Sequence, residues 1–165
     1  GFVGYGHIGQ TCARLAKAFG MRVLALRSDP GKESWLGNLT RSSGVGPFAD
    51  AVYGLVARLF READFVVSVL PGTPDTVDCC GRAEFATMKE DSVFISVGRG
   101  SVVDEVEPLP EDSPLWDCQN LLLTAHNADF TEDYFSLGWS IWRENFDACS
   151  SGRPLVTLVD KSAGY

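Results

Sequence analysis

The sequence has no apolar run long enough to cross a membrane as a helix. It is also short of positive charge, since 14 lysines and arginines stand against 22 aspartates and glutamates, a formal net charge of -8. Nucleic acids and anionic membranes are themselves negative, so this balance argues against both as partners. It still leaves room for a local basic pocket that binds a small anion.

Signals for disulfide or metal pairing are missing as well. The five cysteines contain no C-x-x-C pair, and an odd number cannot all pair within one chain. We therefore expect reduced thiols in a reducing compartment, and no metal site. The five are Cys12, Cys79, Cys80, Cys118 and Cys149.

The chain begins without methionine, and no signal or transit peptide precedes Gly1. Because Gly1 already lies inside a glycine-rich motif, we expect the first part of the parent protein to be missing. An organellar address would have been lost with that part. The remaining sequence predicts a cytoplasmic protein.

What is present is typical of a globular domain of 165 residues, with 45% apolar and 22% charged residues. Continuous apolar runs, expected to be strands, occur at residues 2–3, 23–26, 65–70, 93–97 and 121–123. Stretches with helical periodicity lie between or after them, at residues 8–19, 55–63, 76–88 and 129–150. Continuous rather than alternating apolar strands predict the α/β class, a parallel sheet with helices on both faces.

Local signals set some of the expected boundaries. Gly20 is expected to end the first helix, and Asp129 with Glu132 to form a capping box for the last one. Residues 37–46, rich in glycine and serine, are expected to be a surface loop. An aromatic stripe on the last helix is expected to be core or a subunit contact; its members are Phe135, Trp139, Trp142 and Phe146.

Three glycines follow the first strand in G-x-G-x-x-G spacing, at Gly4, Gly6 and Gly9. The first permits a tight turn, the second lets backbone approach a pyrophosphate, and the third lets the helix pack on the strand. The helix start at His7 and Ile8 then offers backbone N–H groups to phosphates. The motif predicts a dinucleotide site, although similar glycines occur in S-adenosylmethionine enzymes and in plain turns.

The end of the second strand bears on which dinucleotide is bound. An acidic residue normally accepts a hydrogen bond from the ribose 2′-OH there. This chain has Arg27 followed by Ser28, with Asp29 two residues late. Arg27 could pair with a 2′-phosphate, which favours NADP slightly over NAD. The alternative is that Arg27 is a solvated surface side chain.

Four stretches together resemble the D-2-hydroxyacid dehydrogenase family, which contains phosphoglycerate, glyoxylate/hydroxypyruvate and formate dehydrogenases. They are GYGHIGQ at 4–10, SVLPGTPDT at 68–76, MKEDSVFISVGRGSVVDE at 88–105 and EPLPEDSPLWDCQNLLLTAHNA at 107–128. The resemblance implies a Rossmann-type, doubly wound parallel sheet. It also implies hydride transfer between NAD(P) and a small 2-keto or D-2-hydroxy acid.

The resemblance places the family's catalytic residues on Arg99, Glu107 and His126. Arg99 would hold the substrate carboxylate, His126 would act as acid and base, and Glu107 would raise the pKa of that histidine. The alternatives are an exposed turn arginine, a structural histidine and a surface carboxylate. Further cofactor contacts are implied for Leu70, Pro71, Thr76, Val97, Gly98, Arg99, His126 and Ala128. The Thr73 and Thr76 hydroxyls could instead stabilise their own loop.

The segment between residues 97 and 121 breaks the pattern. A parallel crossover is usually helical, yet Pro108, Pro110 and Pro114 forbid a regular helix there. In the resembling family a helix and a strand separate the two flanks that meet here at Glu105. We therefore expect one βα unit to be missing after residue 105, along with most of the first strand. The loss should expose apolar strand edges.

The expected organisation is an incomplete dinucleotide-binding domain at residues 1–150 and a tail at 151–165 that returns to an absent substrate domain. The intact parent is expected to be a homodimer, and the chain as given to have negligible turnover. A rival interpretation is a non-catalytic nucleotide-binding or dimerisation module that uses the aromatic helix as its interface. A methyltransferase-like domain is a weaker rival, which the GRG and AHNA motifs contradict.

Overall fold

The computed structural model describes residues 1–27, 48–104, 110–127, 130–159 and 161. Two compact units, residues 1–110 and 111–165, make up the chain, and each is described by itself. Several predictions fall outside the described residues. They concern Ser28, Asp29, the loop at 37–46, Glu107, Ala128 and Asp129.

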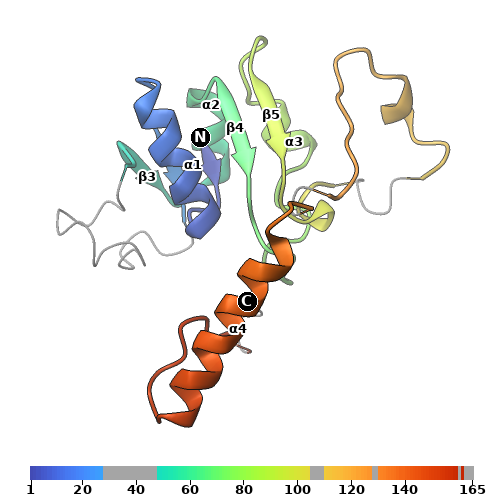
Figure 1. Cartoon of the computed structure of the whole chain (residues 1–165). Coiled ribbons are helices and arrows are strands. Elements are labelled where there is room, and N and C mark those ends of the chain that lie inside the picture. The colour runs from blue at the N-terminus through green and yellow to red at the C-terminus, as the bar shows by residue number, and fades with distance from the viewer. Residues whose placement is uncertain (28–47, 105–109, 128–129, 160, 162–165) are drawn as a thin grey trace. The chain divides into compact units, whose positions relative to one another are not determined.

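The first unit is built on a parallel sheet of five strands (Figure 1). The strands are β1 (Phe2–Val3), β2 (Leu24–Leu26), β3 (Ala51–Tyr53), β4 (Phe65–Ser68) and β5 (Val93–Ser96). Their order is β3-β2-β1-β4-β5, so the direction of winding reverses at β1. This is the order of a doubly wound dinucleotide-binding sheet, and it confirms the predicted α/β Rossmann-type class.

Helices cover both faces of this sheet. Phe2 packs in one apolar cluster with Ala13 of α1 (His7–Ala18), whereas Val3 packs in another with Leu59 and Phe60 of α2 (Val56–Glu62). Successive strand residues point to opposite faces, so α1 and α2 lie on opposite sides of the sheet (Figure 1). The short helix α3 (Arg82–Phe85) joins the α2 side, where Phe85 meets Phe94 edge to face at 4.9 Å.

Most local predictions for this unit hold. The helix expected at 8–19 is α1, and Gly20 follows its end with φ +76°, a conformation that glycine adopts readily. The helix expected at 55–63 is α2. Against the sheet, α1 buries its small residues Gly9 and Ala13, while the larger Phe19 is 81% exposed.

The helix predicted over 76–88 is largely wrong, because only Arg82–Phe85 is helical. The backbone just before α3 forms hydrogen bonds with a distant segment instead. Asp78 and Cys80 donate N–H hydrogen bonds to the carbonyls of Ser101 and Val102, at 2.9 and 3.0 Å. Residues already paired in this way cannot also form i to i−4 helical bonds, so the helix starts only after Gly81.

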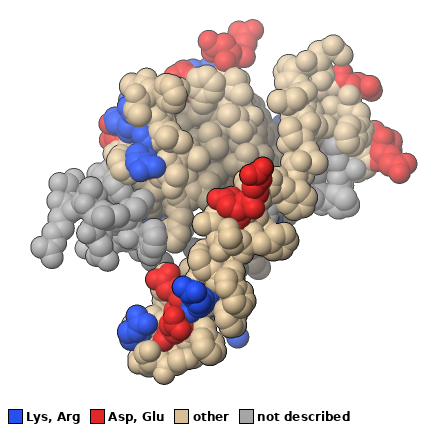
Figure 2. Space-filling model, viewed as in Figure 1, with Lys and Arg blue, Asp and Glu red and all other residues tan. Residues whose placement is uncertain are grey.

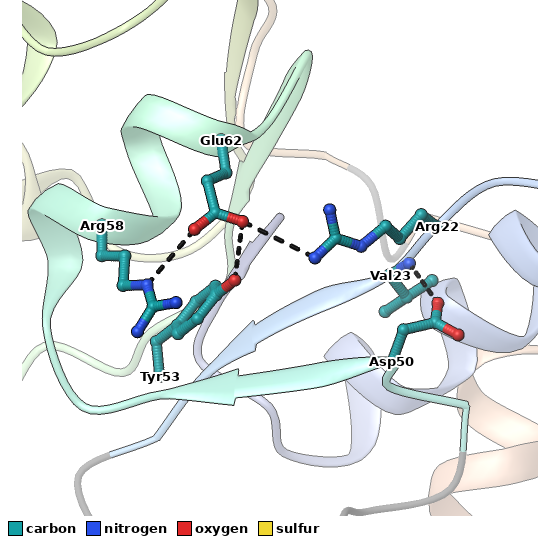
Figure 3. Close-up of polar contacts among 6 residues, drawn as sticks. All are labelled: Arg22, Val23, Asp50, Tyr53, Arg58 and Glu62. Atoms are coloured by element: carbon teal, nitrogen blue, oxygen red, sulfur yellow. Dashed lines mark hydrogen bonds and ion pairs between the residues drawn. The ribbon is translucent and has the colours of Figure 1, made fainter.

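Polar contacts hold β3 to its neighbours (Figure 3). Glu62, in the last turn of α2, accepts a hydrogen bond from the Tyr53 hydroxyl at 2.8 Å and one from Arg58 Nε at 3.2 Å. The Arg58 guanidinium also lies 4.6 Å from the centre of the Tyr53 ring. The Tyr53 hydrogen bond and that of Arg58 hold the pKa of the Glu62 carboxyl below its usual range.

A second carboxylate anchors the other end of β3 (Figure 3). Asp50 accepts the backbone N–H of Val23 at 2.7 Å. It also pairs with the Lys17 ammonium, which the figure does not draw, at 2.9 Å. The Val23 hydrogen bond, followed by that of Lys17, lowers the pKa of the Asp50 carboxyl. The start of β3 is therefore tied both to β2 and to the end of α1.

The far edge of the sheet is β5. Val93 and Ile95 are 44% and 40% exposed, which is unusual for apolar residues of a parallel strand. Among the residues that the structure describes, no strand pairs with the outer edge of β5. This is the exposed apolar edge expected from the loss of a βα unit.

The second unit contains a short 3₁₀ helix, η3 (Pro114–Asp117), and α4 (Tyr134–Ser150). The strand predicted at 121–123 is wrong: these residues are irregular, and Leu122 is 87% exposed. Three apolar residues form a strand only against a partner, and within the described ranges nothing pairs with them. The predicted cap of α4 is also wrong, because the helix begins at Tyr134 with Asp133 as N-cap.

The predicted aromatic stripe forms on α4 but is not core. Trp139 stacks on Trp142 with 4.9 Å between the ring centres, and Trp142 stacks on Phe146 with 5.4 Å between them. These three side chains are 54–61% exposed. Uncharged side chains cover most of the face of this unit seen in Figure 2. No helix in the described part of the chain is long and apolar enough to cross a membrane.

Candidate functional site

The turn after β1 has the geometry that its first glycine predicts. Gly4 has φ +94°, in the left-handed region that side chains with a Cβ rarely adopt. A Cβ on Gly4 would also lie 3.0 Å from Leu70 Cδ2. The first turn therefore requires glycine both for its conformation and for the close approach of the loop after β4.

The second glycine opens the site. Gly6 is the N-cap of α1, and a Cβ added to it would meet nothing within 4 Å. Within the described residues no side chain caps this helix end, and no acidic residue lies in its first turn. Gly6, His7 and Ile8 are all exposed. A group above Gly6 would thus meet bare backbone and the positive end of a helix of 12 residues.

The third glycine sets the position of the helix. A Cβ on Gly9 would lie 2.5 Å from the carbonyl oxygen of Gly4, which is closer than atoms can approach. Only glycine lets the first turn of α1 rest directly on the turn after β1. Gly4, Gly6 and Gly9 therefore play the three separate parts that the motif predicts.

The loop after β4 lies beside this turn. Val69 donates its backbone N–H to the Val3 carbonyl at 2.9 Å, which carries the strand pairing up to Leu70. The Thr76 hydroxyl accepts the N–H of Thr73 at 2.9 Å and donates to the Pro71 carbonyl at 2.6 Å. That hydroxyl thus stabilises its own loop, which favours the structural alternative for Thr76.

The loop after β5 lies against the loop after β4. The N–H of Arg99 contacts the Leu70 carbonyl at 3.3 Å, and a Cβ on Gly98 would lie 2.7 Å from the same oxygen. Gly72, which the sequence did not single out, is also tight, though less so, since its Cβ would lie 3.2 Å from that of Arg99. The loops after β1, β4 and β5 therefore meet at the carboxyl edge of the sheet, where such folds bind ligands.

Arg99 is an exposed side chain on this edge. In the part of the chain that the structure describes, its guanidinium forms no ion pair. A guanidinium held at the carboxyl end of β5 can bind a carboxylate. The backbone contact to Leu70 holds the residue in place, and the side chain stays available.

Arg27 ends β2 on the same edge. Its N–H donates to the Tyr53 carbonyl at 3.1 Å, and its side chain is half-buried. Burial raises the pKa of Tyr5 to about 12, with a contribution from Asp50, and the charge of Arg27 acts against this rise. Arg27 therefore lies close enough for its charge to act on Tyr5, the residue between the first two glycines.

Ser68, at the end of β4, is a residue that sequence reasoning missed. Its side chain is fully buried, and the hydroxyl has no hydrogen-bond partner in the described structure. The signal was a serine within an otherwise apolar strand. No group of histidine, cysteine or acidic residues suited to a metal occurs among the residues described.

The other predicted site residues lie in the second unit or outside the described residues. His126 lies in the second unit, exposed, in a tight turn where Asn127 N–H donates to the Ala125 carbonyl at 3.0 Å. Glu107, Ser28 and Ala128 lie outside the described residues. The convergence of Arg99, Glu107 and His126 stays a prediction.

A doubly wound parallel sheet whose glycine turn meets two further loops at the switch point defines a dinucleotide-binding domain. Residues 1–107 match the family described as D-isomer specific 2-hydroxyacid dehydrogenase, NAD binding domain. The chain belongs to this family.

Three known proteins show how far the likeness extends. A glyoxylate reductase of Korarchaeum cryptofilum is 29% identical over 98% of this chain and 52% of its own length. The NADPH-dependent glyoxylate/hydroxypyruvate reductase of Sinorhizobium meliloti, solved with NADP and sulfate, is 27% identical with a TM-score of 0.77, covering 99% and 56%. A D-isomer specific 2-hydroxyacid dehydrogenase of Xanthobacter autotrophicus, solved with NADPH and MES, is 25% identical with a TM-score of 0.78, covering 99% and 71%.

The chain spans about half the length of the curated relatives it matches. The alignment with the Korarchaeum protein runs over 182 positions, more than the 165 residues of the chain, so that relative carries residues without a counterpart here. The family match ends at residue 107, next to the expected junction at Glu105. The missing internal segment stays a prediction.

Proposed function

We propose that this chain is the cofactor-binding part of a dehydrogenase that reduces a small 2-keto acid, or oxidises the D-2-hydroxy acid, with NAD(P). The observation that carries the proposal is the meeting of three loops at the carboxyl edge: the turn Gly4–Gly9 and the loops at Leu70 and Gly98. Membership of the family supplies the reaction class.

The residues present fit a dinucleotide. The open space above Gly6 and the uncapped first turn of α1 suit its pyrophosphate. Leu70 and Pro71 on one loop and Val97 and Gly98 on the other would line the path toward the nicotinamide. When bound, the nicotinamide supplies the carbon that gives or accepts hydride.

Arg27 supports a preference for NADP over NAD. A guanidinium at the end of β2 can pair with the 2′-phosphate of NADP. It cannot accept a hydrogen bond from the ribose 2′-hydroxyl of NAD, as an acidic residue at this position would. The Sinorhizobium and Xanthobacter proteins were both solved with an NADP-type cofactor. Their cofactors thus point the same way as the residue.

Three residues would handle the substrate in the intact parent. Arg99 would bind its carboxylate and polarise the keto group. His126 would give a proton to the developing hydroxyl oxygen during reduction or take it during oxidation, and Glu107 would raise the pKa of the histidine. Glyoxylate and hydroxypyruvate are the substrates to test first, since the named relatives reduce them.

The chain alone is expected to turn over poorly. Hydride transfer needs a substrate held in place and shielded from water, and residues that cover about half the length of the relatives would supply only one wall of such a cleft. The rival function, a non-catalytic nucleotide-binding or dimerisation module, is favoured by one observation. This is the exposed aromatic stripe of Trp139, Trp142 and Phe146 on α4.

Two measurements on the purified chain separate these functions. Titration with NADPH and NADH, followed by nicotinamide fluorescence, should show saturable binding. Sedimentation at several concentrations should show a dimer, weakened by Trp142→Lys and unchanged by Glu144→Lys as the matched control on α4. A tight dimer that binds neither nucleotide would contradict the cofactor role and favour the dimerisation module. Reduction of glyoxylate or hydroxypyruvate at a rate comparable to an intact enzyme would refute the expected lack of turnover.

A further inference from the structure

Two adjacent cysteines lie in the first unit, beside the predicted site. The sulfur atoms of Cys79 and Cys80 are 3.8 Å apart and in contact. Cys80 is fully buried in the apolar cluster that also contains Val102 and Val103, whereas Cys79 is half-buried. A reagent from solution would therefore meet Cys79 first, with a second thiol directly behind it.

The backbone of this pair is joined to the segment that follows Arg99. Cys80 forms a parallel bridge with Val103, donating its N–H to the Val102 carbonyl at 3.0 Å and accepting the N–H of Asp104 at 3.3 Å. Residues 100–102 form the 3₁₀ turn η2. A change in the backbone at Cys80 would therefore directly displace the turn after Arg99.

We propose that Cys79 and Cys80 form a thiol modification site that reacts with hydrogen peroxide and closes to a disulfide between the two neighbouring residues. The Cys79 thiolate attacks one oxygen of the peroxide, the O–O bond breaks, and a sulfenic acid and hydroxide form. The Cys80 sulfur then attacks the Cys79 sulfur, and water leaves as the S–S bond forms. In sum, two thiols lose two electrons and two protons, and the peroxide becomes two molecules of water.

The electrostatics of the pair suit these two roles. The hydrogen bond between the thiols lowers the pKa of Cys79, even though burial and the charge of Glu84 oppose this. The same hydrogen bond, with burial, raises the pKa of Cys80. The more accessible thiol, Cys79, is thus the one that ionises more readily to the reactive thiolate. The buried thiol, Cys80, stays protonated until it attacks the sulfenic acid.

Closing the bond would change the local structure. The sulfurs must come from 3.8 Å to about 2.0 Å. The ring formed by two adjacent cysteines also forces both side chains into one tight geometry, whereas Cys80 is now fully buried and Cys79 only half-buried. The bridge from Cys80 to Val103 should therefore weaken and the turn after Arg99 shift. An effect on cofactor binding rests on the function proposed above, whereas the disulfide itself does not.

The test uses the reduced full chain. After treatment with hydrogen peroxide, denaturation and alkylation, mass spectrometry should show the peptide with Cys79 and Cys80 lacking two hydrogens and unalkylated. Because the second thiol is already in contact, disulfide formation within this pair should be at least about tenfold faster than formation of any disulfide that involves Cys118 or Cys149. Cys80→Ser should instead accumulate a sulfenic acid on Cys79 that dimedone traps, and Cys118→Ser should behave as wild type.

Two results would overturn the proposal. One is a pair that stays fully alkylatable while Cys118 and Cys149 are oxidised; this outcome needs only the wild-type chain and does not depend on the folding of a variant. The other is equal oxidation of Cys80 in wild type and in Cys79→Ser. NADPH titration of both redox forms is read separately. Weaker binding after oxidation, restored by a reductant, is expected, whereas binding in neither form would contradict the cofactor role and leave the disulfide standing.

Discussion

The α carbon of Gly9 lies so near the carbonyl oxygen of Gly4 that a methyl group on it would come within 2.5 Å of that oxygen. The contact joins the start of α1 to the end of β1, the two elements between which a dinucleotide phosphate would bind. It makes the position of the helix, and with it the direction of its N–H groups, depend on the absence of one side chain.

Replacing Gly9 by alanine should therefore move α1 and reduce stability. Overpacking of this kind costs about 1–3 kcal/mol of unfolding free energy. Gly6→Ala is the matched control, because a Cβ there meets nothing within 4 Å and folding should be almost unchanged. Both variants should lose NADPH binding, the first through the helix and the second by blocking the pyrophosphate. Urea unfolding and fluorescence titration measure the two effects, and equal stability of the variants would contradict the argument.

Arg27→Asp should reverse the preference between the two cofactors. Loss of a charge-assisted hydrogen bond of about 1.5–3 kcal/mol should weaken NADPH binding roughly ten- to hundredfold, while NADH binding holds or improves. Arg14→Asp makes the same charge change on an exposed part of α1 and should alter neither ratio. Parallel titrations with both nucleotides give the ratio directly. An unchanged ratio in Arg27→Asp would leave the arginine as a solvated surface residue.

Phe60 fills the core between α2 and β5. It is fully buried, and the centre of its ring lies 5.9 and 5.8 Å from the ring centres of Phe85 and Phe94. Phe60→Ala should lower the unfolding free energy by about 3–5 kcal/mol. Phe19→Ala, on a side chain that is 81% exposed, should change it by less than about 0.5 kcal/mol. A similar loss in both variants, measured by urea unfolding, would mean that the first unit lacks the described core.

Tyr53→Phe should change how stability depends on pH. The Tyr53 hydrogen bond lowers the pKa of Glu62 in the folded chain, so it contributes stability above the ordinary glutamate pKa and loses it as the pH falls through the lowered value. The variant should be less stable than wild type near neutral pH, and the difference should shrink in acid. Unfolding measured at about pH 7 and about pH 3 spans this range. A difference that stays constant across it would exclude the linkage.

The glycine turn could be read from the sequence because its geometry is fixed locally. Gly4 needs a positive φ, and Gly9 needs the absence of a Cβ. Both are steric demands that three glycines in fixed spacing reveal. The two main helices, α1 and α2, follow for the same reason, since each has its own period and its own end signals.

Elements that depend on distant partners were harder to predict. The strand β3 was missed because Ala51–Tyr53 is only three residues long and gains its hydrogen bonds from β2. Residues 121–123 have the composition of a strand but no paired edge in the described structure. Residues 78–80 have helical periodicity, yet their backbone pairs with the segment that follows Arg99.

The bare outer side of β5 has a practical consequence for anyone preparing this protein. In the described structure its amide groups face no neighbouring strand, and the apolar Val93 and Ile95 flank them. Such a rim is a template for strands of other molecules, so precipitation should grow with concentration and storage time. Dilute handling, or fusion to a highly soluble carrier, should preserve monodisperse material long enough for spectroscopy.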